Sequence, residues 1–110
     1  MVSASLRGLG IRLAIAAAIS LSLSAARAEE PTNVMIDNFT FEPAQLTVKV
    51  GTTVTWKNRD DIPHTVVSVG KFRSKTMDTE DSYSFTFTAA GDYKYFCSLH
   101  PHMIGTIKVE

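Results

Sequence analysis

Residues 95–105 read YFCSLHPHMIG and concentrate side chains that bind soft metal ions. This stretch holds the only cysteine of the chain, two of its three histidines and one of its four methionines. Cys97, His100 and Met103 follow the spacing C-x2-H-x2-M. A thiolate, an imidazole and a thioether form a soft, mixed donor set that suits copper, and Cu(I) in particular. The stretch is therefore a candidate copper site.

A site of two histidines and one cysteine with a weak axial methionine is the arrangement of blue-copper electron-transfer centres. Such a site needs one more histidine, and His64 is the only one outside the stretch. His102 is close to His100 in a tight loop, where neighbouring side chains point different ways, so we expect it to be exposed and not a ligand. Met35 and Met77 are expected to be packing residues.

Taken alone, Cys97 would most often be a small buried hydrophobic residue. A lone cysteine in an exported protein forms no internal disulfide, which leaves intermolecular pairing, a reactive thiol or a metal site. A Cys–His nucleophilic enzyme would need an orienting third group and an oxyanion hole, and the sequence indicates neither. Four protein donors also leave no open position of the kind that hydrolytic metal sites keep. We therefore predict no enzymatic activity.

The first 28 residues have the pattern of a secretory signal peptide. Arg7 and Arg12 lie in a positive leading region, an apolar run follows at about residues 13–23, and Ala26 and Ala28 provide the small residues of a cleavage site. An uncleaved membrane anchor is the alternative, but the apolar run is short of the ~20 residues that span a bilayer. We expect a periplasmic mature chain of residues 29–110 with no membrane insertion.

The expected mature chain has the size of one domain and a mildly acidic charge. Removing Arg7, Arg12 and Arg27 from eleven basic side chains leaves eight against eleven acidic ones, a net charge of −3 with histidine neutral. Nucleic-acid-binding domains usually present a basic face. The composition therefore predicts no nucleic-acid partner.

Seven short segments have the pattern of β-strands, at residues 34–43, 45–50, 53–58, 64–69, 82–88, 93–97 and 105–109. They alternate apolar and polar side chains, are rich in β-branched and aromatic residues, and are separated by turn residues. Residues 71–81 are predicted to form a loop, and residues 59–61, RDD, a solvated turn. The pattern indicates an antiparallel sandwich or barrel. His64 and the 97–103 loop would then lie at strand ends.

The stretches VTWKNRDDIPHTV and YSFTFTAAGDYKYFCSLHPHMIGTIKV resemble the cupredoxins, most closely the amicyanin and plastocyanin group. The resemblance covers nearly all of residues 29–110 and implies an all-β, Greek-key antiparallel β-sandwich. It also implies one type 1 copper ion with His64, Cys97 and His100 as equatorial ligands and Met103 as the axial ligand. Thr65 stands where the family often has an asparagine that ties the two ligand loops together. Its backbone N–H is expected to donate to the Cys97 sulfur.

The resemblance further implies a carrier of single electrons, with copper cycling between Cu(I) and Cu(II). His100 is the expected electron port, surrounded by an apolar surface from Pro101, Ile62, Pro63 and Ile104. The expected partners are c-type cytochromes or an oxidoreductase, which would dock near His100 on a monomer through a small interface. Copper carriage or scavenging would use the same ligands and stays open on the sequence alone.

Overall fold

The structure is a computed structural model and describes residues 32–110. The expected signal peptide, residues 1–28, and its cleavage site lie outside the described residues. Residues 32–110 form nine strands and no helix, so no helix in this part of the chain is long and apolar enough to span a membrane. The strands are β1 (Thr32–Asp37), β2 (Thr40–Glu42), β3 (Gln45–Val48), β4 (Thr53–Asn58), β5 (Val67–Ser68), β6 (Phe72–Arg73), β7 (Ser82–Thr86), β8 (Gly91–Cys97) and β9 (His100–Val109).

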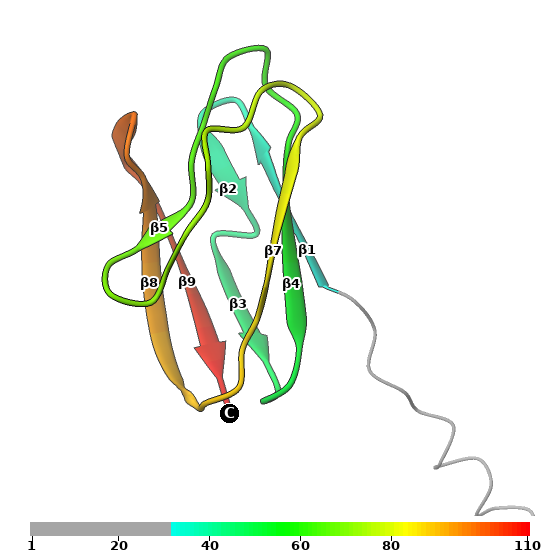
Figure 1. Cartoon of the computed structure of the whole chain (residues 1–110), viewed down its shortest axis with the longest axis vertical. Helices are drawn as coiled ribbons and strands as arrows, with labels where there is room; N and C mark the ends of the chain where they lie inside the picture. The colour runs from blue at the N-terminus through cyan, green and yellow to red at the C-terminus, as the bar shows by residue number, and fades with distance from the viewer. Residues whose placement is uncertain (1–31) are drawn as a thin grey trace, which may run out of the picture. The chain divides into compact units, whose positions relative to one another are not determined.

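Two sheets form the sandwich, one with the strand order β2-β1-β4-β7 and the other with the order β3-β9-β8-β5-β6 (Figure 1). The predicted all-β sandwich is confirmed, with one refinement of the strand directions. Strand β1 runs parallel to β4, and β3 runs parallel to β9, whereas the other pairs are antiparallel. Parallel neighbours need a crossover connection. In the sequence, β3 follows β1 and β2 and precedes β4, and it belongs to the second sheet, so the chain crosses to that sheet and back before it forms β4.

The segment 34–43, predicted as one strand, is a hairpin of β1 and β2. Asn38 and Phe39 form its two-residue turn with positive φ angles of 52° and 58°, and Asp37 pairs with Thr40 across it. Two positive φ angles are typical of the type I′ turn, whose twist matches that of the flanking strands. This turn places the Phe39 side chain at the end of the sandwich.

The segment 64–69, also predicted as a strand, is regular only at β5. His64 forms an isolated antiparallel bridge with Met77, with hydrogen bonds of 3.1 and 2.9 Å between their backbone groups. The predicted loop 71–81 contains the short strand β6, and its Phe72 and Met77 are buried in the core. The loop therefore holds the backbone of His64 through Met77.

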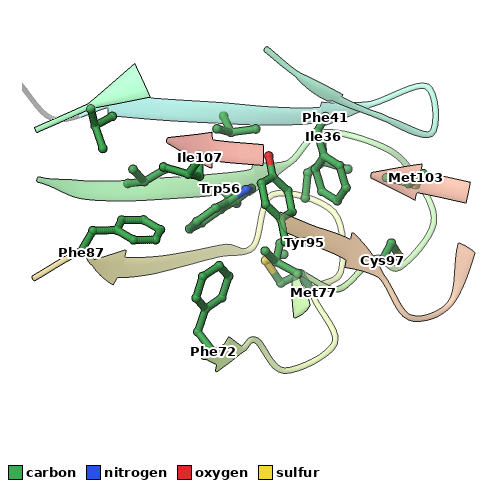
Figure 2. Packing of buried hydrophobic residues seen from close by; sticks show 14 of the residues in the cluster. Ile36, Phe41, Trp56, Phe72, Met77, Phe87, Tyr95, Cys97, Met103 and Ile107 are labelled. Carbon is green, nitrogen blue, oxygen red and sulfur yellow. The ribbon is translucent and has the colours of Figure 1, made fainter. Parts of the chain in front are cut away.

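The core is aromatic at its centre and extends toward the candidate donors (Figure 2). The ring centroid of Trp56 lies 5.6 Å from that of Phe72 and 5.4 Å from that of Tyr95. Tyr95 faces Gly105 on β9, where a Cβ atom would overlap the tyrosine ring. Glycine at this position lets the ring lie across the neighbouring strand. The same buried cluster includes Cys97 and Met103, so the packed core holds the first and the last candidate donor of the stretch.

Candidate metal centre

His64, Cys97 and His100 bring one ligand atom each within 4.8 Å of one another. The Nδ1 atom of His64 lies 3.6 Å from the Cys97 Sγ atom, and the Nδ1 atom of His100 lies 3.7 Å from the same sulfur. His64 and Cys97 have no exposed surface, and His100 is partly exposed. The prediction that the remote histidine joins the two donors of the loop is confirmed.

The hairpin of β8 and β9 positions the other donors. Cys97 ends β8, His100 begins β9, and only two residues separate them. The ladder shifts register between Phe96 and Cys97, and Cys97 then pairs with His100. This irregularity brings both side chains to the same end of the sandwich.

Met103 and His102 occupy opposite faces of β9. Met103 is 5% exposed and belongs to the core cluster that contains Cys97, whereas His102 is exposed, as predicted. Met77 is also buried in the core, which fits its expected packing role, and Met35 is half-buried. Met103 is thus the methionine of the hairpin that lies inside, and its bond to a metal stays a prediction.

Thr65 ties the two ligand segments together. Its backbone N–H donates to Cys97 Sγ over 3.3 Å, as predicted. Its Oγ1 atom accepts the Ser98 backbone N–H over 2.8 Å, lies 2.8 Å from Ser98 Oγ and lies 3.8 Å from the sulfur. A hydroxyl both donates and accepts. Thr65 therefore provides through a hydroxyl the side-chain tie that an asparagine amide often provides.

Asp60 is a site residue that the sequence analysis missed. Its Oδ2 atom lies 2.8 Å from His64 Nε2, and its carboxylate also accepts the backbone N–H groups of Asn38, over 2.6 Å, and Phe39, over 3.0 Å. Burial acts to raise the pKa of Asp60, but these hydrogen bonds and the nearby imidazole outweigh it and lower that pKa below its usual value. The residue is therefore ionised at neutral pH, although it belongs to a segment predicted to be a solvated turn.

Phe39 is a second residue missed by the sequence analysis. Its ring meets His64 and His100 edge to face, with centroid distances of 5.6 and 5.1 Å. Phe39 is 48% exposed, so one side of the ring faces solvent while the other covers the two imidazoles. Spacing indicated neither residue, because Phe39 reaches the site through the hairpin turn that Asp60 holds, and Asp60 lies in a polar triplet typical of solvated turns.

The donor set fits copper by its chemistry. One thiol and two imidazoles are soft and borderline ligands of the kind that copper prefers. The backbone N–H of Thr65 donates to the sulfur and holds it in place beside the two imidazoles. The structure thus supplies three donors in a largely buried site, with Asp60 and Thr65 holding His64 and Cys97 in place.

The sequence of this chain is similar to those of known cupredoxins. A model of the cupredoxin-like domain matches residues 10–109. Amicyanin from Paracoccus denitrificans is 43% identical over 83 residues, a match that covers 70% of this chain and 63% of that protein. The chloroplastic plastocyanin of Tetradesmus obliquus is 32% identical, with 98% of this chain and 85% of that protein covered. The chain thus spans less than two thirds of the Paracoccus amicyanin.

Solved structures give the same result. A purple cupredoxin from Nitrosopumilus maritimus superposes with a TM-score of 0.70 and 33% identity, covering 72% of this chain and 99% of that one. A reduced amicyanin variant superposes with a TM-score of 0.71 and 40% identity, covering 79% and 89%. Cupredoxins bind one copper ion, and His64, Cys97 and His100 form the matching ligand group here. The chain belongs to the cupredoxin family.

Proposed function

We propose that this protein is an exported type 1 (blue) copper protein that carries single electrons between redox proteins and does not convert a substrate. The observation that carries the proposal is the buried Cys97 sulfur facing the Nδ1 atoms of His64 and His100 at 3.6 and 3.7 Å. These three residues are the proposed equatorial ligands, and Met103 is the proposed axial one. Bound copper supplies a one-electron couple between Cu(II) and Cu(I).

The surrounding residues hold the donors in place. Thr65 fixes the sulfur through its N–H and fixes the start of the ligand loop through its bonds to Ser98. Asp60 fixes the ring of His64. Donors held in this way change position little when an electron arrives or leaves, and little rearrangement favours fast transfer. Burial of His64 and Cys97 keeps water away from them.

His100 is the proposed electron port, because it alone of the three donors has exposed surface. Exposed apolar residues lie on both sides of His100 in the sequence: Leu99 is 49% exposed and Ile104 is 66% exposed. A surface of this kind suits weak docking of a redox protein through a small interface. We propose c-type cytochromes or an oxidoreductase as partners, which bind the protein as a monomer near His100.

Burial favours electron transfer over the two alternatives. A copper carrier must hand its metal to an acceptor, yet His64 and Cys97 have 0% exposed surface, so transfer of the metal would require the site to open. A Cys–His nucleophilic enzyme must bring a substrate to the sulfur, and the same burial prevents this. Slow copper exchange together with fast electron self-exchange is the result that we expect.

The proposal also places the mature domain at residues 29–110 and the protein in the periplasm. The leading arginines, the apolar run and the small residues before residue 29 support export. Mass spectrometry of the protein recovered after export tests this proposal, with Glu29 expected as the first residue. A mass that retains residues 1–28 would contradict it.

Addition of Cu(II) to the purified protein tests the central proposal. We expect an intense blue colour from charge transfer between the thiolate and copper, and reversible loss of the colour on one-electron reduction. The matched control is Cys97→Ser, which keeps the size of the side chain and removes the soft donor. A colourless wild-type protein, or an equally coloured serine variant, would refute the proposed site.

A further inference from the structure

The carboxylate of Asp60 connects three parts of the molecule. One oxygen accepts the N–H of Asn38, and the other accepts the N–H of Phe39 and faces Nε2 of His64. The side chain is only 11% exposed, and its own backbone N–H is held by Asn58 Oδ1 over 2.9 Å. The carboxylate is thus fixed between the β1–β2 turn and a proposed copper ligand.

This contact determines which nitrogen of His64 carries a proton. An ionised carboxylate can only accept hydrogen bonds. The nitrogen that faces it, Nε2, must therefore be the donor, and in the neutral ring Nδ1 then keeps its lone pair on the side of Cys97. A carboxylate behind a ligating histidine orients the ring and raises the basicity of the nitrogen that binds metal. Its negative charge also stabilises Cu(II) more than Cu(I), because an opposite charge stabilises a charged group.

We propose that Asp60 is a positioning residue that acts through His64: it fixes the Nε2–H tautomer and lowers the reduction potential of the site. This inference rests on the proposed function, because a reduction potential requires bound copper. The same carboxylate holds the turn that presents Phe39 to the rings of His64 and His100. The β1–β2 hairpin and the metal centre are thereby joined through one side chain.

A purely structural role is the competing interpretation, in which Asp60 only fastens the turn at Asn38 and Phe39. The two roles predict different results for Asp60→Asn. The amide oxygen of asparagine can replace one acceptor, but its NH2 group would face a donor, and toward His64 it favours the opposite tautomer. A structural role lowers stability alone, whereas a positioning role also changes the tautomer and the potential.

The experiment compares wild type with Asp60→Asn, Asp60→Glu and the control Asp61→Asn. Asp61 is adjacent and exposed, so its substitution removes the same charge without touching His64. Nitrogen NMR of the metal-free proteins reports the His64 tautomer, and electrochemistry of the copper-loaded proteins reports the potential. Blue colour in each variant shows separately that the copper site itself is intact.

We expect the Nε2–H tautomer in metal-free wild type and in Asp61→Asn, and its loss in Asp60→Asn. Loss of such a partner typically lowers metal affinity by about 10–100-fold. Taking the lower end for Cu(II), the Cu(II)/Cu(I) equilibrium of Asp60→Asn should shift about tenfold toward Cu(I). This shift raises the reduction potential by ~59 mV. Asp60→Glu keeps the charge and should lie closer to wild type. The proposal is overturned by an Nδ1–H tautomer in wild type, which needs no folded variant. It is also overturned if Asp60→Asn retains the wild-type potential, or if Asp61→Asn shifts it equally.

Discussion

Removing the Thr65 hydroxyl should loosen the contact between the two ligand segments. In Thr65→Val the shape of the side chain is nearly kept, but the two 2.8 Å contacts with the Ser98 N–H and Oγ are lost. A net hydrogen bond contributes about 1 kcal/mol, and a buried donor left unpaired costs about 1–3 kcal/mol. Ser98 is exposed, so water can reach its polar groups. We therefore expect a loss of about 1–2 kcal/mol in unfolding free energy.

Thermal unfolding of the metal-free protein, followed by circular dichroism, measures this loss without a contribution from copper binding. For a domain of this size ~1 kcal/mol lowers the melting temperature by about 4–8 °C. The matched control is Thr55→Val, which removes an exposed hydroxyl lying 2.7 Å from Ser84 Oγ and should change the unfolding free energy by no more than about 0.5 kcal/mol. Equal melting of both valine variants and wild type would refute the proposed tie, and Thr65→Ser should restore stability.

Three further changes test the site and the core. Cys97→Ala should leave a folded but colourless protein, as circular dichroism and visible absorption together would show, because the thiol forms no disulfide. Met103→Leu should keep the blue colour and raise the potential measured by voltammetry, since an axial donor tunes the potential; an unchanged potential would exclude Met103 as a ligand. Burial raises the pKa of Tyr95 to about 12 from 10.0, partly offset by the Trp56 indole N–H, although this pair does not meet hydrogen-bond geometry. Because the pKa of Tyr95 is higher in the folded than in the unfolded protein, the free energy of unfolding keeps its full value below pH 10. It decreases as the pH rises toward 12, by ~3 kcal/mol in total. Denaturant titrations should show this loss in wild type and not in Tyr95→Phe.

Features encoded by local pattern could be predicted from the sequence. The C-x2-H-x2-M spacing pointed to Cys97 and His100, which a two-residue turn brings to the same end of the sandwich, whereas the role of Met103 stays a prediction. Alternation identified the inward face of β8, where Tyr95 and Cys97 are both buried. His64 could be assigned because no other histidine lies outside the loop.

Features that depend on tertiary contacts could not be predicted. The turn at Asn38 and Phe39 contains no glycine and interrupts a segment whose composition favours one continuous strand. Asp60 lies in a polar triplet typical of solvated turns, and its partner Asn38 is 22 residues away. Only the folded chain shows that this acid is held by backbone N–H groups and aimed at an imidazole.

The distribution of the donors over the chain makes the metal a reversible cross-link. Cys97, His100 and Met103 share one hairpin, whereas His64 is 33 residues before Cys97. Closing a loop of this length in the unfolded chain costs on the order of 4 kcal/mol in the disulfide relation. An unfolded chain still contains the C-x2-H-x2-M stretch and can bind copper there, which reduces the stabilisation that binding gives to the fold. The part that remains depends chiefly on His64, so bound copper would give a protein with a single cysteine a constraint like the one that a disulfide gives to many small exported domains.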